Sequence, residues 1–250
     1  MTSAAADYFT DLTSRLDRLS TDQAKPIDAA AELFAAAIAG CGRVHVHDTG
    51  HMIGHEFVSR TGGFLAFTRL EYGGSVSTDG LARASDPDTA QADQATAARL
   101  LLEWVFAQNT IRAGDVLLLS SVSGVSIAVV ELALQARSHG IPVVALTSSA
   151  FSLSLTSRHP SGQRLMDVAD VVLDNLAPYG DAVQPLPGLL EPVCPISGVA
   201  GAALLWSVVA LTADKLLAQG VVPSIYPSIN LPDGPERVAA IEQHYKETGQ

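Results

Sequence analysis

The spacing of apolar residues changes from a helical period to short aliphatic runs about 40 residues into the chain. Helical spacing covers residues 7–20 and 26–39. Beyond them, runs typical of buried strands alternate with helical stretches; the runs are residues 43–47, 64–68, 115–119, 142–147 and 169–173. This alternation predicts an α/β domain over residues 41–220, with a parallel sheet covered by helices on both faces. Residues 1–40 are then an N-terminal helical extension, and residues 221–250 a C-terminal tail.

The stretch at residues 115–126, DVLLLSSVSGVS, joins a buried strand to a helix through a turn of small hydroxyl residues. The free N–H groups and the positive dipole end of the following helix favour an anion at such a turn. Ser121, Ser123 and Ser126 add neutral hydroxyl donors. The alternative is that these serines only cap the helix, as serine commonly does at that position.

Two other predicted strands also end in small polar residues, namely Asp48–His51 and Thr147–Ser149, the latter centred on Ser148. The carboxyl ends of parallel strands lie at one edge of a sheet, where ligands of such folds bind. We therefore expect three polar segments to meet at one edge. A ligand site explains that convergence better than helix capping alone.

The composition is acidic, with a formal net charge of −11, a pI near 4.9 and no basic stripe. A nucleic-acid surface needs clustered Lys and Arg, so no nucleic acid is expected as a partner. Scattered basic residues such as Arg158, Arg164 and Lys215 are available to receive a small anion.

Cysteine usage and hydropathy bear on the compartment. Cys41 and Cys194 are far apart and show no metal-type pairing, so we expect reduced core thiols in a cytoplasmic protein. Residues 1–19 lack the basic and apolar regions of a secretory signal. Residues 192–213 are uncharged and long enough to span a bilayer, but two prolines and the lack of a basic flank argue against a membrane. A buried or subunit-interface helix starting near Ser197 is expected instead.

Several stretches together resemble the sugar isomerase (SIS) domain proteins, and within them a bacterial branch related to phosphoheptose isomerases. The stretches are DTGHM at 48–52, HEFVSRTGG at 55–63, RAGDVLLLSSVSG at 112–124, GIPVVALTS at 140–148, SRHPSGQRL at 157–165, ADVVLDN at 169–175 and SGVAGA at 197–202. The resemblance implies a three-layer sandwich around a five-stranded parallel sheet. It also implies a sugar or sugar phosphate bound at the strand ends, and a homodimer or homotetramer whose subunits share their sites.

The resemblance also assigns candidate binding residues. The family's phosphate-binding loop matches Ser121, Ser123, Gly124 and Ser126 here, while Thr49 and Gly50 match the small residues after the first strand. Relatives commonly carry Gly in place of Asp48 and Ser in place of Met52. Part of the pocket is therefore expected to differ in this chain.

An aldose–ketose isomerase needs a base that moves a proton between two carbons and an acid that protonates oxygen. The resemblance implies that Glu56 is the base. Our hypothesis for the acid is His51, which is nearest the loop in sequence, or His159 in the SRHPSG segment. The alternative for Glu56 is a helix-surface ion pair with Arg60, four residues further on. The sequence thus predicts a sugar or sugar-phosphate isomerase, or alternatively a phosphosugar-binding sensor without turnover, since this fold also serves in regulators. No helix-turn-helix segment accompanies the domain, which favours the enzyme over a transcriptional regulator.

A metal-dependent sugar isomerase is a further alternative. Residues 45–56 contain nitrogen and oxygen ligands of the kind that zinc or manganese accepts: His45, His47, Asp48, His51 and His55. A divalent metal is therefore possible, and no other cofactor is expected.

Two segments are expected to be irregular. Residues 71–95 are polar and acidic and predict a long loop that runs into a helix. Residues 225–236 are rich in proline and turn residues; they either close over a neighbouring subunit's site or form a surface linker.

Overall fold

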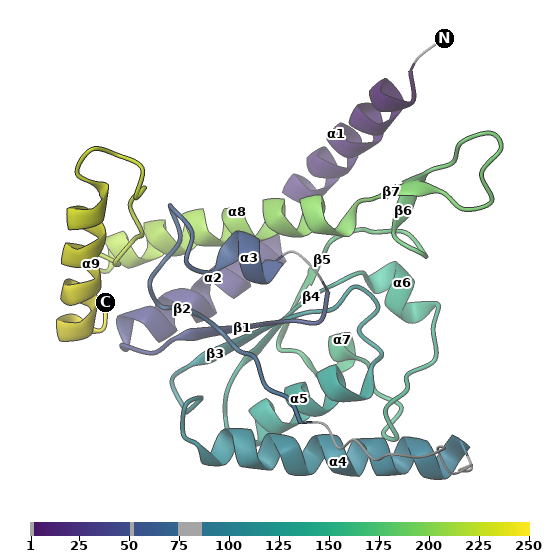
Figure 1. The fold of residues 1–250 in the computed structure, drawn as a ribbon, viewed down its shortest axis with the longest axis horizontal. Coiled ribbons are helices and arrows are strands. Elements are labelled where there is room, and N and C mark those ends of the chain that lie inside the picture. The colour runs from purple at the N-terminus through teal and green to yellow at the C-terminus, as the bar shows by residue number, and fades with distance from the viewer. Residues whose placement is uncertain (1–2, 51–52, 75–86) are drawn as a thin grey trace, which may run out of the picture.

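A five-stranded parallel sheet forms the middle layer of the computed structural model, which describes residues 3–50, 53–74 and 87–250 (Figure 1). Its strands are β1 (Val44–Asp48), β2 (Phe67–Arg69), β3 (Val116–Ser120), β4 (Val143–Thr147) and β5 (Val171–Asp174), in the order β2-β1-β3-β4-β5. Asp48 at the end of β1 pairs with Ser120 at the end of β3. The loops that follow these two central strands therefore start side by side.

Helices cover both faces of the sheet (Figure 1). One face carries α2 (Ala24–Ala39), α3 (Ile53–Phe57) and α8 (Ser197–Ala218), with α1 (Ala4–Asp22) at its edge; the other carries α4 (Pro87–Ala107), α5 (Ile127–Ser138) and α7 (Leu165–Val168). In Figure 1, α1 projects away from the rest of the molecule. The predicted α/β sandwich with an N-terminal helical region is confirmed.

Successive residues of β3 supply two separate cores. Val116 and Leu118 pack into the core beneath α2, α3 and α8, while Leu117 and Leu119 pack into the core beneath α4 and α5. All four side chains are buried, and burying each one stabilises the fold by about 2 kcal/mol. A strand that is buried on both faces has a continuous aliphatic sequence, which is why this element is clear from the sequence.

The apolar helix α8 begins at Ser197, as expected from the sequence. It is the one helix of the described residues that is long and apolar enough to cross a membrane, by length and composition. In the structure its inner side packs on α2 and on the sheet. Gly201 permits this close approach, since a Cβ there would lie 3.1 Å from Leu146 and 3.2 Å from Ile53.

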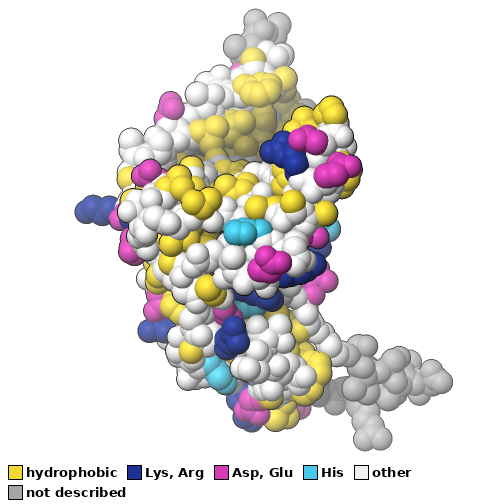
Figure 2. Space-filling view, turned by 90° about the vertical axis from the view of Figure 1, so that its left-hand side faces the viewer, with side chains coloured by type: hydrophobic (Ala, Val, Ile, Leu, Met, Phe, Trp, Pro, Cys, Tyr) yellow, Lys and Arg dark blue, Asp and Glu magenta, His cyan; other side chains and the backbone are white. Residues whose placement is uncertain are grey.

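Four elements were not predicted from the sequence: α6 (Ser149–Leu153), the antiparallel pair β6 (Ala182–Gln184) and β7 (Val193–Pro195), and α9 (Gly234–Thr248). The helix α9 has few buried residues, so its apolar spacing is weak in the sequence. Figure 2 shows the side of the molecule that carries α9, where apolar and charged side chains are mixed. Residues 75–86 of the predicted long loop lie outside the described residues, and α4 begins at Pro87.

The expectation that both cysteines are core thiols is wrong. Cys41 is exposed and Cys194 is half-buried, and both are free. Each residue has a positive φ angle, 58° for Cys41 and 66° for Cys194, in a turn or hairpin at the surface. A positive φ angle is typical of turns, and turns lie at the surface. The two cysteine side chains are therefore outside the core.

Asp115 is a buried carboxylate at the amino end of the sheet that holds three strands together. Its Oδ1 accepts from the N–H of Arg43 at 2.9 Å, and its Oδ2 accepts from the N–H of Arg112 and lies next to His45 Nε2, both at 3.0 Å. The other ring nitrogen of His45 is 2.9 Å from Thr68 Oγ1. This network links the beginnings of β1 and β3 to β2.

Burial alone would raise the pKa of Asp115, but the hydrogen bonds from His45, Arg112 and Arg43 outweigh it and hold the pKa below its ordinary value. The ionised form is therefore favoured in the folded state. Its contribution to stability is present above the ordinary carboxyl pKa and is lost as the pH falls through the lower, folded-state pKa.

We expect Asp115→Asn to lower the free energy of unfolding at pH 7 by about 3 kcal/mol. The reason is that the N–H groups of Arg43 and Arg112 and the ring of His45 would then lack the negatively charged acceptor. Urea denaturation followed by circular dichroism measures this change. The exposed Asp17→Asn is the matched control, with an expected effect below about 0.5 kcal/mol. The difference between wild type and Asp115→Asn should shrink toward acid pH. Equal stability of the two proteins at pH 7 would contradict the role of this carboxylate.

Candidate functional site

The loop at residues 121–126 connects the end of β3 to the first turn of α5. Ser126 is the N-cap residue of α5, and its side chain makes no capping hydrogen bond. Ser121 is buried, and its hydroxyl accepts from the N–H of Gly124 at 3.3 Å, so it stabilises the loop from within. Ser123 and Ser126 are half-buried.

The carbonyl groups of this loop are bound to the protein behind it. Val122 accepts from the N–H of Ser148 at 2.9 Å, Gly124 from that of Leu165 at 2.8 Å, and Val125 from that of Arg158 at 3.0 Å. Within the part of the chain that the structure describes, the N–H groups of Ser123, Val125 and Ser126 have no protein partner. Together with the first turn of α5, these N–H groups form a set of donors suited to an anion.

Gly124 is the residue that lets the loop turn so tightly. Its φ angle is +61°, in the left-handed region. A Cβ at this position would lie 3.1 Å from Thr147 Oγ1 and 3.2 Å from Leu165 Cβ. Both the backbone conformation and the space therefore require glycine.

The turn after β1 lies against this loop. The N–H and the hydroxyl of Thr49 both donate to the carbonyl of Ser120 at 3.0 Å. Asp48 accepts from the N–H groups of Gly50 and Ile53, also at 3.0 Å, and thereby organises the turn into α3. Asp48 thus has a structural role that a glycine could not fill. His51 and Met52 lie outside the described residues.

Two cavities meet at Asp48 and Gly50, at the carboxyl edge of the sheet. One, of about 280 Å³, is lined by His47, His55, Arg69 and Tyr72. The other, of about 90 Å³, is lined by Ser120, Asn175, Asp181 and Ser197 at the amino end of α8. Sequence reasoning missed most of these residues as site candidates, because they follow strands or loops without a recognisable motif.

The larger of these two cavities has a fixed set of polar groups. Arg69 donates to the carbonyl of Gly54 at 2.7 Å and lies 3.3 Å from His55 Nδ1. His47 Nδ1 is 3.0 Å from the carbonyl of Leu70, and its ring lies 5.0 Å from that of Tyr72. Burial raises the pKa of Tyr72 to about 12, so its phenol is protonated at neutral pH.

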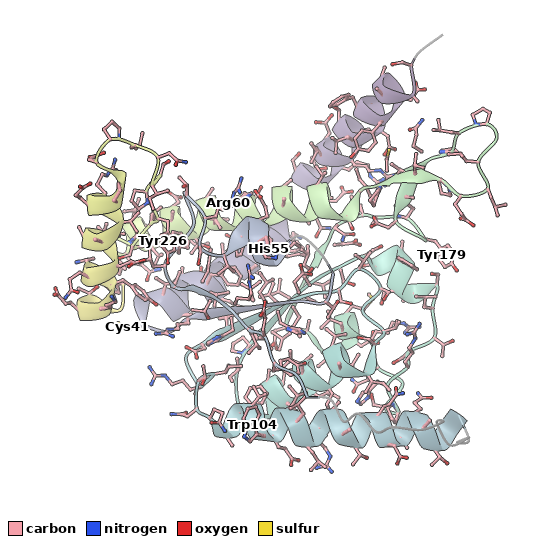
Figure 3. The ribbon with its side chains drawn as sticks, in the orientation of Figure 1. Cys41, His55, Arg60, Trp104, Tyr179 and Tyr226 are labelled. Carbon is pink, nitrogen blue, oxygen red and sulfur yellow. The ribbon has the colours of Figure 1, made fainter. Side chains whose placement is uncertain are left out.

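Glu56 lies beside these cavities but lines neither of them. Its Oε1 is 3.3 Å from Arg60 Nε and accepts from Trp206 Nε1 of α8 at 3.4 Å. In Figure 3, His55 lies on α3, and Arg60 lies further toward α8. The helix-surface ion pair considered as the alternative is thus present, and the role of Glu56 as a base stays a prediction.

Two further site candidates make structural hydrogen bonds. His159 is buried, with Nε2 at 2.9 Å from Glu131 Oε2 and Nδ1 at 2.8 Å from Ser161 Oγ. Ser148 is fully buried; its hydroxyl donates to the carbonyl of Ala177 and accepts from the N–H of Phe151, capping α6. Neither side chain lines the two cavities at the carboxyl edge.

The histidine-rich segment is spread over both ends of β1. His45 lies at the amino end with Asp115, whereas His47, Asp48 and His55 lie at the carboxyl end. Across the described residues, no group of three or more His, Cys, Asp or Glu side chains is placed to hold a metal ion. His51, the remaining candidate ligand, is not among those residues.

Of the three basic residues considered for a small anion, Arg158 is bound to the loop at residues 121–126 through its N–H, which donates to the carbonyl of Val125. Its carbonyl accepts from the side chain of Gln91 on α4, and its own side chain is exposed. Arg164 instead donates to the carbonyls of Ser152 and Leu155. Lys215 pairs with two carboxylates of α2, Asp28 and Glu32.

The sheet, the loop after β3 and the flanking helices define a sugar isomerase domain. The family model described as SIS domain matches residues 7–148, more than half of the chain, so the chain belongs to the SIS-domain family. Within it, the chain belongs to the UPF0309 proteins. The relatives of that name from Brucella anthropi and Brucella canis are 36% and 35% identical over 249 residues, which cover 99% of this chain and 98% of each relative.

Solved structures support the same fold. The phosphoheptose isomerase GmhA from Neisseria gonorrhoeae matches with a TM-score of 0.50 and 19% identity, over 86% of this chain and 97% of that one. A phosphoheptose isomerase from Francisella tularensis matches with a TM-score of 0.50 and 18% identity, over 86% of this chain and all of that one. At these identities the likeness concerns the fold.

We expect Gly124→Ala to destabilise the protein by at least about 1 kcal/mol more than Gly140→Ala does. Both residues have positive φ angles, 61° and 71°, so both substitutions carry the same backbone penalty. Only at Gly124 does the added methyl meet neighbouring atoms, since nothing lies within 4 Å of a Cβ at Gly140. Thermal and urea unfolding measure the difference, and equal effects would show that the loop relaxes freely.

Proposed function

We propose that this protein binds a sugar phosphate at the carboxyl edge of its sheet and isomerises it by proton transfer between adjacent carbons. The observation that carries the proposal is the loop at residues 121–126. Its carbonyls are bound behind it, the N–H groups of Ser123, Val125 and Ser126 have no partner among the described residues, and the side chains of Ser123 and Ser126 are half-buried. A phosphate monoester suits such a set of donors at a helix N-terminus, and Arg158 adds a positive charge beside it.

The sugar portion is proposed to occupy the cavity lined by His47, His55, Arg69 and Tyr72. These side chains offer donors and acceptors for hydroxyl groups, and the ring of Tyr72 offers an apolar surface. Membership in the SIS family and the phosphoheptose isomerases among the similar structures support this class of ligand.

Replacing Ser123 by Ala should weaken the binding of a sugar phosphate about tenfold, because one hydrogen bond to a charged phosphate is lost. Isothermal titration with fructose 6-phosphate and other aldose and ketose phosphates measures the affinity. Ser138→Ala, at the other end of α5, is the matched control and should leave the affinity unchanged. Unphosphorylated fructose binding as tightly as its phosphate would contradict the assignment of the loop.

We further propose that Glu56 is the base and that it acts at a site shared between subunits of a homo-oligomer. In its own chain Glu56 lies outside both cavities, so a neighbouring copy is needed to bring the carboxylate to a bound sugar. Exposed apolar side chains support such an assembly: Leu190 is 96% exposed, Tyr179 70% and Phe9 65%. Figure 3 shows Tyr179 beside α6, close to the β6–β7 hairpin.

Glu56→Gln should keep sugar-phosphate binding and lower turnover by about 100-fold or more. Exchange of the C1 and C2 protons of the sugar in D₂O, followed by NMR, detects proton transfer even at chemical equilibrium. Glu103→Gln is the control, because Glu103 also pairs with an arginine four residues away, Arg99. Full exchange by Glu56→Gln would exclude this base.

Mixing the Glu56→Gln and Ser123→Ala proteins tests the shared site in the same assay. A mixed pair of subunits contains one site with both substitutions and one with neither, so activity should return. Activity that stays at the level of the two separate proteins would place both residues in a site within one chain.

Binding of sugar phosphate without turnover is the second candidate. The position of Glu56 favours it, since the ion pair with Arg60 and the contact with Trp206 give this carboxylate a structural role. In that case the wild-type protein binds the sugar phosphate but catalyses no proton exchange during prolonged incubation.

A further inference from the structure

A cavity of about 750 Å³ lies at the opposite, amino end of the sheet, away from the phosphate loop. Four parts of the chain enclose it: the beginning of β1, β2 with the residues just before it, the loop before β3, and α9 with its flanking segments. Figure 3 shows Cys41 and Tyr226, two of its lining residues, beside α9. Its volume falls in the range of about 300 to 1,000 Å³ that is usual for small-molecule sites.

Positive charge gathers in this cavity. Arg43, Arg112 and Lys246 line it, and each comes from a different segment. For none of the three does a carboxylate of the described residues lie within ion-pair distance of the cationic group. Figure 2, which views this side of the molecule, shows Lys and Arg side chains near the middle of the face with an acidic side chain next to them.

Two carboxylates also line the cavity, but they do not balance these charges. Asp115 is buried and already accepts hydrogen bonds from two backbone N–H groups and lies against His45. Glu242 is the one remaining acidic residue of the lining. The protein as a whole has a net charge of −11, but this cavity is lined by more cationic side chains than free carboxylates. The electrostatic potential inside it is therefore expected to be positive. The residues that line it therefore match a ligand with negative charge.

The remaining lining residues indicate what the ligand carries besides charge. Tyr245 lies beside Arg43, and Tyr226 faces the cavity from the segment before α9. Thr68 and Asn109 add hydrogen-bonding side chains. Arginine binds phosphate through paired N–H groups, and tyrosine rings pack against flat organic groups.

We infer that this cavity is a second binding site, for a phosphorylated small molecule of nucleotide size. The phosphates contact Arg43, Arg112 and Lys246, and the organic part lies against Tyr226 and Tyr245. This site is separate from the proposed sugar-phosphate site, because the sheet lies between the two and they share no lining residue.

Isothermal titration with pyrophosphate and with ADP tests the inference. ADP should bind the wild-type protein, and Arg112→Gln/Lys246→Gln should weaken that binding about tenfold or more. The control is Lys25→Gln/Arg237→Gln, which removes the same charge from exposed positions outside the cavity and should leave the affinity unchanged. Circular dichroism confirms that both double variants are folded.

Ser123→Ala separates the two sites, because it alters the phosphate loop at the other edge of the sheet. ADP binding that persists in Ser123→Ala supports the second site, and binding that is lost there assigns the ligand to the loop instead. The inference is overturned if neither pyrophosphate nor ADP binds, or if both double variants weaken binding equally. Tighter binding of citrate than of pyrophosphate would likewise overturn the assignment to phosphate.

Discussion

The buried carboxylate of Asp115 is the constraint on which the arrangement of the sheet depends. It accepts from the N–H groups of Arg43, just before β1, and of Arg112, in the turn before β3. It also fixes His45, which in turn contacts Thr68 of β2. Because these strands are short, their register at the amino end determines where they stop at the carboxyl end. The same contacts that stabilise the fold therefore place the turn after β1 and the loop after β3 at the same level.

At the carboxyl edge of the sheet, the loop after β3 is held by hydrogen bonds to its carbonyls, whereas several of its N–H donors have no partner among the described residues. Hydrogen bonds from Ser148, Leu165 and Arg158 hold the carbonyls of the loop at residues 121–126, and Gly124 leaves no room for a larger residue. A site built this way needs little reorganisation when an anion binds, because its donors are already oriented. The neighbouring cavity lined by His47, His55, Arg69 and Tyr72 is held in the same way, since Arg69 donates to the carbonyl of Gly54 and His47 contacts the carbonyl of Leu70.

The sequence predicted the parts of this structure that depend on local pattern. The strands β3 and β4 are continuous aliphatic runs, and the loop after β3 combines small hydroxyl residues with a glycine, so both could be predicted. The ion pair of Glu56 with Arg60 could also be predicted, but its contact with Trp206, the exposure of Cys41 and the cavity beside α9 could not. Each depends on which surface a distant helix covers, and the sequence pattern of α9, with few buried residues, does not indicate where it packs.

The order of the strands also has a consequence for how the chain folds during synthesis. The central strand β1 pairs with β3, and His45 meets Asp115 across a separation of 70 residues. Until β3 has left the ribosome, β1 has an unpaired edge and His45 lacks its carboxylate. Long-range parallel pairing of this kind forms slowly, and partly made chains expose apolar surface. The central part of the sheet can therefore form only after the strand that contains Leu118 has been synthesised.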